Sequence, residues 1–278
     1  LPKQAGAEKH LTLLGLTATA SFDVLADVER ELSGDAAFEL DSDTIVRDEN
    51  TNRLELQYKI EKVPVKYEDD QYYNQKGYID ESLPRAVKMT DKWTVYESKK
   101  EFLKDYLDSL PGYIEDLQNK DSIKTIKTRF NERQNIDGVI YTDLTTDLPE
   151  EFFAENESYT QAGIIFCPHK NSTGISVNAN KESLLGKIQD IGTFMGSGDG
   201  DDADESDRES FKNLDLFREN KLPLMVATKA FGMGIDKPNV RFTVNMNYSS
   251  SLESFVQEAG RAGRDRKMAL STILLSDY

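Results

Sequence analysis

Four short runs in the C-terminal part of the chain are almost wholly apolar. Stretches of mixed polarity separate them, and they cover residues 163–167, 222–228, 240–246 and 269–275. Such a run is typical of a strand buried on both faces of a sheet. Strands that alternate with helical or loop segments predict an α/β fold with a parallel sheet flanked by helices. Ligands of such sheets bind beyond the carboxyl ends of the strands, so the loops after these runs are candidate sites.

The N-terminal part has a weaker pattern. Residues 11–16 form another short apolar run, which predicts a buried strand, and residues 22–32 follow as an amphipathic helix. Residues 53–60 alternate between apolar and polar positions, which predicts a half-buried strand with its apolar side chains on one face. Residues 98–110 form an amphipathic helix that we expect to stop at Pro111.

The charge of the chain is unevenly distributed. The net charge is −16 over 278 residues, which by itself argues against nucleic-acid binding. Residues 36–160 hold 28 acids and 17 bases, and residues 199–209 hold 7 acids and 1 base, which we interpret as a solvated surface loop. Residues 210–278 hold 10 bases and 7 acids, a balance of +3. The C-terminal part therefore remains a candidate for binding an anion.

Cysteine and histidine are too sparse for a metal centre. The single cysteine, Cys167, excludes an internal disulfide, and with His169 it lacks a second pair of ligands, so we expect no metal and a buried thiol. No apolar run is long enough to span a membrane, and a cytoplasmic location is the default. The first residues include neither an initiator Met nor a signal peptide, so we expect a piece of a longer protein.

The stretch from Ser250 to Arg266 carries the candidate chemistry. Ser250 and Glu253 form a capping box that predicts the start of a helix. On such a helix Gln257, Arg261 and Arg264 would share one face, and two arginines so close together repel each other unless an anion lies between them. The small residues at 260, 262 and 263 would let that anion approach, and guanidinium groups suit a polyphosphate. The alternative is a surface arginine pair balanced by nearby acids.

Two longer motifs make the prediction specific. Residues 257–265, Gln-Glu-Ala-Gly-Arg-Ala-Gly-Arg-Asp, resemble motif VI of superfamily 2 helicases in the form typical of RecQ-like enzymes. Residues 227–238, Ala-Thr-Lys-Ala-Phe-Gly-Met-Gly-Ile-Asp-Lys-Pro, resemble their motif V. Residues 163–170 resemble motif IV and residues 17–20 resemble motif III, in the family's order. The resemblance covers 161–278 well and 1–60 loosely, and 61–160 remain unmatched.

The resemblance implies two RecA-like domains with ATP bound between them and a single strand lying across both. It makes Arg264 the arginine finger that reaches the γ-phosphate and Arg261 its companion. Gln257, Gly234 and Asp236 match positions near the nucleotide.

The remaining matched residues concern nucleic acid and coupling. Thr228, Lys170 and Lys229 match contacts to the nucleic-acid backbone, and Thr17 and Thr19 match the element that couples ATP to strand movement. Local chemistry offers plainer roles: Thr228 as a turn cap, Asp236 as a turn former and Lys170 as a solvated lysine.

What the sequence lacks limits its activity. It contains no Gly-x-x-x-x-Gly-Lys-Ser/Thr loop and no Asp-Glu-Ala-His box, the elements that hold ATP phosphates and Mg²⁺. We therefore expect residues 1–35 to be the tail of a first RecA-like domain, 36–160 a linker with a mixed α/β insertion, and 161–278 the second RecA-like domain.

The expected function follows from this division. The chain would be the C-terminal half of an ATP-dependent DNA helicase or translocase, with no ATPase activity alone. Its partners would be single-stranded or forked DNA and the first RecA-like domain of the same polypeptide. An RNA helicase fragment and a degenerate motor that acts as a binding or scaffold module are the alternatives.

Overall fold

The computed structural model describes residues 30–31, 53–65, 92–134, 143–155, 157–171, 174–196, 203–229, 231 and 235–276. The chain divides into two compact units, Leu1–Asn52 and Arg53–Tyr278. Within the first unit only 30–31 are described, and they are helical. The predicted strand at 11–16 and most of the predicted helix at 22–32 lie outside the described residues. Everything below concerns the second unit.

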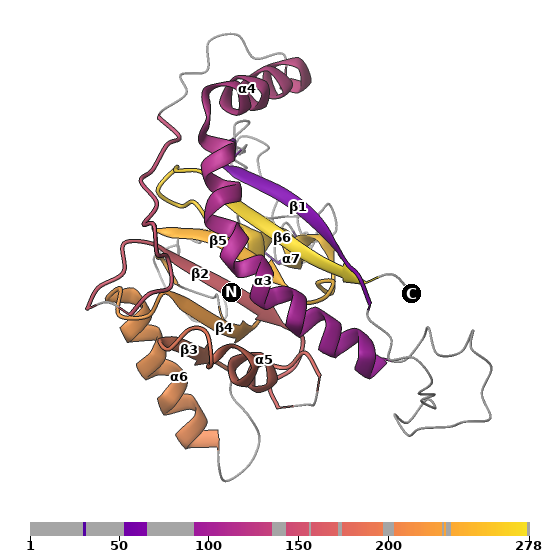
Figure 1. Ribbon diagram of the computed structural model, residues 1–278, viewed down its shortest axis with the longest axis vertical. Helices are drawn as coiled ribbons and strands as arrows, with labels where there is room; N and C mark the ends of the chain where they lie inside the picture. The colour runs from indigo at the N-terminus through magenta and orange to yellow at the C-terminus, as the bar shows by residue number, and fades with distance from the viewer. Residues whose placement is uncertain are drawn as a thin grey trace, which may run out of the picture. The chain divides into compact units, whose positions relative to one another are not determined.

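The second unit is built on a six-stranded, all-parallel, RecA-like sheet (Figure 1). The strand order is β1-β6-β5-β2-β4-β3. The strands are β1 (Leu56–Val63), β2 (Ala162–Cys167), β3 (Ile191–Phe194), β4 (Leu224–Thr228), β5 (Val240–Asn245) and β6 (Ala269–Ser276). The four apolar runs are confirmed as β2, β4, β5 and β6. The short strand β3 was not predicted, since four residues give too little pattern.

Helices cover both faces of this sheet. They are α3 (Lys92–Gln118), α4 (Lys120–Gln134), α5 (Val177–Leu184), α6 (Ala203–Arg218) and α7 (Leu252–Ala259). One core joins α3 and α5 to side chains such as Ile165 and Val244. The other joins α6 and α7 to side chains such as Ile164 and Met225. Alternate residues of each central strand thus enter opposite cores, as the two-residue repeat of a strand requires.

Helix α3 is longer than the sequence indicated. It continues through Pro111 to Gln118, so the predicted stop at Pro111 is wrong. Leu110 and Ile114, on either side of the proline, have no solvent exposure and lie in the same core as Leu103 and Leu107. Burial of this apolar stripe outweighs the cost of about 3 kcal/mol that a proline carries inside a helix.

Strand β1 and helix α3 belong to the RecA-like unit. β1 pairs with β6 over its whole length, from Leu56 opposite Ala269 to Val63 opposite Ser276. β1 and α3 thus share the sheet and the core of the second unit, and the domain boundary expected at residue 160 stays a prediction. The apolar side of β1 is only partly covered, because Tyr58 and Ile60 remain 55% and 65% exposed at the sheet edge.

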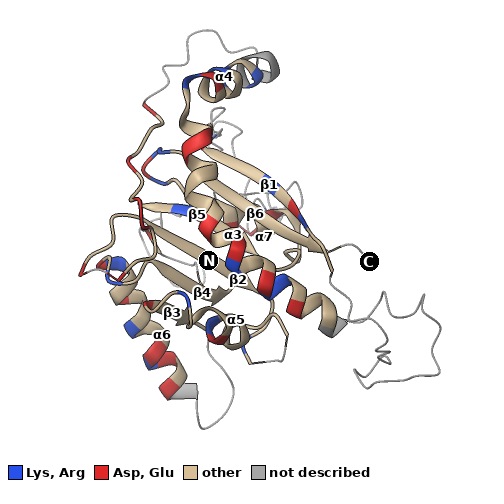
Figure 2. Cartoon of the chain, in the orientation of Figure 1, with Lys and Arg blue, Asp and Glu red and all other residues tan. Residues whose placement is uncertain are grey.

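Charge follows this layered architecture. The central strands β2 and β4 contain no charged residue, while acidic side chains gather along α3 and α6 (Figure 2). Residues 203–209 of the expected acidic loop form the first half of α6, so that prediction is wrong for them. Ser210, Leu214 and Phe217, spaced four and three residues apart, bury one helix face and leave the acids on the other.

Candidate functional site

The predicted site residues fall into two groups in the structure. Thr228, Lys229 and Lys170 lie where β4 and β2 end. Gln257, Arg261, Arg264 and Asp236 lie around the end of α7 and the segment before β5. Thr17, Thr19 and Gly234 lie outside the described residues.

Helix α7 begins one residue after the predicted cap and ends before the two arginines that were expected to lie on it. Its N-cap is Ser251, whose Oγ accepts a hydrogen bond from Ser254 N, rather than Ser250. It ends at Ala259 with Gly260 as C-cap, so Arg261 and Arg264 follow the helix and occupy turns. The helical face expected to join Gln257 to both arginines is therefore wrong. Gly263, with φ +65°, has a backbone conformation that no α-helix continues.

Arg264 is held at the surface by the segment before β5. Its Nη1 donates to Ile235 O at 2.7 Å and to Asp236 Oδ1 at 3.2 Å. The Asp236 side chain is 85% exposed, so the ion pair contributes little to stability. The structure thus brings together the expected finger and an expected nucleotide-site carboxylate, in an arrangement that an incoming anion could replace.

Arg261 lies half-buried beside Arg264. Burial, and after it the positive charge of Arg264, lowers the pKa of Arg261 to about 10, while Glu258 acts in the opposite direction. Arg261 thus remains protonated at neutral pH. Its Nε is buried and has no hydrogen-bond partner among the described residues. Two adjacent cations with an unused donor form a site that favours an anion.

Glu258 belongs to the framework of this site. Its carboxylate is buried and accepts hydrogen bonds from Asn245 Nδ2 and Ser249 Oγ. These bonds fasten the last turn of α7 to the end of β5. The sequence suggested only a surface counter-charge for this residue, and its buried position comes from tertiary packing.

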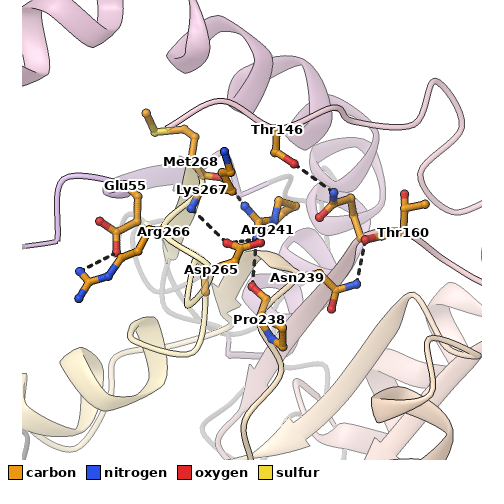
Figure 3. A network of polar contacts seen from close by, with 12 residues as sticks. Glu55, Thr146, Thr160, Pro238, Asn239, Arg241, Asp265, Arg266, Lys267 and Met268 are labelled. Carbon is orange, nitrogen blue, oxygen red and sulfur yellow. Dashed lines mark hydrogen bonds and ion pairs between the residues drawn. The ribbon is translucent and has the colours of Figure 1, made fainter. Parts of the chain in front are cut away.

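A polar network anchors the turn that carries the arginines (Figure 3). Arg241, in β5, is fully buried, and its Nη2 lies 2.6 Å from both carboxylate oxygens of Asp265. The same guanidinium donates to Pro238 O at 3.0 Å and to Met268 O at 3.1 Å. Sequence reasoning missed Arg241 because it stands within an apolar run. An arginine at such a position is itself a signal, since a buried charge needs a partner.

Arg53 approaches the same turn from the start of β1. Its Nη1 donates to Gly260 O at 2.8 Å and its Nη2 to Ala262 O at 2.5 Å. The small residues were expected to admit a phosphate. Among the described residues, the group that uses this space is the Arg53 guanidinium.

The second group, Thr228, Lys229 and Lys170, lies at the C-terminal ends of the parallel strands, here called the carboxyl edge of the sheet. Thr228 is buried, and its Oγ1 has no hydrogen-bond partner among the described residues. Lys229 is exposed and its Nζ donates to Ser250 Oγ at 3.0 Å. Lys170 Nζ donates to Gly196 O. Two cations therefore stand at the edge where parallel α/β sheets bind ligands.

Other classes of site find little support. The described residues contain no group of three His, Cys, Asp or Glu side chains that could hold a metal ion. Cys167 is a buried free thiol, and burial raises its pKa far above the ordinary value. Among the helices that the structure describes, none is long and apolar enough to cross a membrane.

Comparison with known proteins places this geometry in a family context. Residues 143–266 match the family "Helicase conserved C-terminal domain". The chain is 36% identical over 122 residues to ATP-dependent DNA helicase Q-like 2 of Arabidopsis thaliana, covering 44% of this chain and 16% of that protein. It is 33% identical over 152 residues to ATP-dependent DNA helicase RecQ of Bacillus subtilis, covering 55% and 24%.

The chain thus spans less than a quarter of the length of these relatives. Among solved structures it is similar to S. cerevisiae Dbp5 bound to RNA and ADP BeF3, with 21% identity and a TM-score of 0.36, covering 43% of this chain and 29% of that chain.

Proposed function

We propose that this chain, whose residues 143–266 form a RecQ-like superfamily 2 helicase C-terminal domain, supplies the arginine-finger half of an ATP-dependent DNA helicase or translocase. The observation that carries the proposal is the turn after α7. Among the residues that the structure describes, the buried Nε of Arg261 has no hydrogen-bond partner, and neighbouring Arg264 forms its ion pair with the exposed Asp236.

The chemistry of these arginines suits ATP hydrolysis. Charge accumulates on the transferred phosphoryl group and its neighbours in the transition state, and an arginine finger that meets this charge contributes about 10³ to 10⁵ in rate. Arg264 would leave the Asp236 carboxylate for the γ-phosphate, and Arg261 would contact the same phosphates. Gln257 and Gly234 would lie near the nucleotide.

The remaining parts of the ATP site would come from another domain. The sequence has no phosphate-binding Gly-x-x-x-x-Gly-Lys-Ser/Thr loop, and the described residues offer no metal cluster for Mg²⁺. The arginines fit the phosphates but nothing described fits the metal. We propose that a first RecA-like domain of the same polypeptide supplies both functions, and that the present chain does not hydrolyse ATP alone.

The carboxyl edge of the sheet would contact the nucleic acid. Lys170 and Lys229 would neutralise backbone phosphates, and Thr228 Oγ1, which has no partner within the described part of the chain, would donate to one. Relatives named as DNA helicases favour DNA over RNA as the substrate, and we propose that it is single-stranded or forked. Thr17 and Thr19 would couple ATP to movement along this strand.

The test is to measure ATP hydrolysis by the full-length protein and its stimulation by single-stranded DNA. Arg264→Ala should lower kcat by about 10³ or more. Arg218→Ala, which removes an exposed arginine at the end of α6, is the matched control and should leave kcat unchanged. A wild-type protein without DNA-stimulated turnover, or an Arg264→Ala variant as active as wild type, would refute the motor function.

A further inference from the structure

The end of α7 is bound to the very start of the compact unit by one side chain. Arg53 is the first residue of the unit Arg53–Tyr278 and precedes β1 by three residues. Its two terminal nitrogens donate to the carbonyls of Gly260 and Ala262, at 2.8 and 2.5 Å. Those two carbonyls flank Arg261. The fork of Arg53 therefore fixes the Gly260–Arg261 and Ala262–Gly263 peptide planes, in the turn that carries Arg261 and leads to Arg264.

The guanidinium of Arg53 is itself held firmly. Its Nε donates at 2.8 Å to Oε1 of Glu55, a side chain that is only 3% exposed. The same carboxylate oxygen lies 3.4 Å from Nη1 of Arg266, which follows the turn that carries Arg261 and Arg264. All three nitrogens of Arg53 are thus engaged, and its side chain is 23% exposed. Because the Arg53 guanidinium is fixed by Glu55, it can in turn fix the positions of the Gly260 and Ala262 carbonyls.

Two glycines of the turn, Gly260 and Gly263, leave little room for a side chain. A Cβ at position 263 would lie 3.3 Å from Arg53 Nη2, besides meeting Lys267 O at 2.9 Å. A Cβ at position 260 would lie 2.9 Å from Val256 O and 3.9 Å from Arg53 Nη1. Glycine at position 263 therefore lets the backbone and the guanidinium approach each other closely, while glycine at position 260 avoids the carbonyl of Val256.

Deepening the function proposed above, on which this inference rests, we propose that Arg53 is a positioning residue for the arginine finger. It holds the Arg261–Arg264 turn in place for catalysis and ties that placement to the point where the chain enters the domain. Arg53 does not contact ATP. A movement of the entering chain relative to the sheet would shift both carbonyls together and carry the two arginines with them.

The experiment is a double-mutant cycle in DNA-stimulated ATP hydrolysis by the encoded protein. Arg53→Met should lower kcat by about 10- to 100-fold, since a displacement of about 1 Å of a catalytic group costs about 100-fold. Because the effect passes through the turn that carries the finger, Arg53→Met should cause a much smaller loss in an Arg264→Ala background than in wild type. Affinity for single-stranded DNA should remain within about 2-fold of wild type, since the track lies elsewhere. Arg218→Met is the matched control.

Each outcome decides the inference. A loss as large in the Arg264→Ala background as in wild type would show that Arg53 acts independently of Arg264 and would overturn the inference. So would an Arg53→Met variant with wild-type kcat while Arg264→Ala is inactive. Failure of Arg264→Ala itself to lower kcat would instead overturn the proposed function, so the two failures are distinguishable.

A milder variant keeps the test informative if Arg53→Met does not fold. Arg53→Lys retains the charge, but a single ammonium cannot bond both carbonyls in the geometry of a planar fork. Arg53→Lys should therefore also lower kcat, and its effect should likewise be much smaller beside Arg264→Ala than in wild type. Full activity of Arg53→Lys would show that charge alone suffices and would overturn the role given to the fork.

Discussion

Arg241 and Asp265 form an ion pair in which the arginine has no solvent exposure and the carboxylate receives its Nη2 at 2.6 Å from each oxygen. Asp265 directly follows Arg264 in sequence. The pair therefore fixes the position of the Arg261–Arg264 turn relative to β5, and it does so from inside the domain. Burying the Arg241 charge is unfavourable, and its attraction to the Asp265 carboxylate compensates for that. Loss of the carboxylate alone would therefore leave a buried charge without its counter-ion.

Asp265→Asn should destabilise the domain strongly. The amide keeps the shape of the side chain but leaves the buried Arg241 charge uncompensated, a situation that costs about 3–5 kcal/mol. Urea unfolding of the chain measures this loss. Asp236→Asn is the matched control, since its 85%-exposed side chain should change stability by about 0.5 kcal/mol or less. Equal effects of the two substitutions would show that the Arg241 pair is not a special anchor.

Gly263→Ala should be destabilising where Gly112→Ala is not. Gly263 has φ +65°, and an added Cβ would meet Lys267 O at 2.9 Å, so we expect a loss of more than about 1 kcal/mol. Gly112 lies within α3 with nothing within 4 Å of an added Cβ, so alanine there should gain about 0.5–1 kcal/mol. Thermal unfolding of both variants tests the contrast, and a loss at both positions would contradict it.

The sheet was predictable because its signal is local. β2, β4, β5 and β6 are buried on both faces, so each produces a short apolar run that needs no knowledge of its neighbours. The turn after α7 was harder to predict. The end of α7 depends on the left-handed backbone at Gly263 and on carbonyls that bond Arg53, more than 200 residues away in sequence.

The candidate arginines stand out in the sequence, whereas the residues that support them do not. Arg261 and Arg264 are conspicuous because two arginines so close together repel each other unless an anion lies between them. Arg53 looked like a polar strand position and Arg241 like a member of an apolar run. Their roles come from contacts between distant segments, which a single sequence does not encode as a pattern. The predicted end of α3 at Pro111 was wrong for the same reason, because burial of Ile114 in the core outweighs the helix-breaking tendency of Pro111.

Lys229→Ala should weaken binding of single-stranded DNA and reduce its salt dependence. Removing one cation from a backbone phosphate lowers the slope of log affinity against log salt by about 0.7 for a single strand. Fluorescence anisotropy at several salt concentrations measures both quantities. Lys212→Ala removes an exposed cation on α6, outside the carboxyl edge, and should leave the slope unchanged. An unaltered slope for Lys229→Ala would place the strand away from β4.

Lys99 should make stability depend on pH between about 8 and 10.5. This lysine of α3 is 3% exposed, and its Nζ donates to Met246 O at 2.9 Å. Burial lowers its pKa from 10.5 to about 8. Above pH 8 the unfolded chain binds a proton at this residue that the folded domain does not, so stability rises with pH until about 10.5. Burial also lowers the pKa of Lys237 to about 8, which acts in the same direction. The buried thiol of Cys167 acts in the opposite direction above about pH 9, because burial raises its pKa.

The substitution Lys99→Met isolates this contribution, since Lys237 and Cys167 remain in both proteins. The free energy of unfolding, from urea titrations at pH 7 and pH 9, should rise more in wild type than in the variant. The difference should be about 1 kcal/mol, because one pKa unit corresponds to about 1.4 kcal/mol and only the part above pH 8 counts. Lys212→Met, an exposed lysine, should show the wild-type dependence. Parallel behaviour of wild type and Lys99→Met would mean that the Lys99 ammonium is solvated, and that α3 does not seal the end of β5.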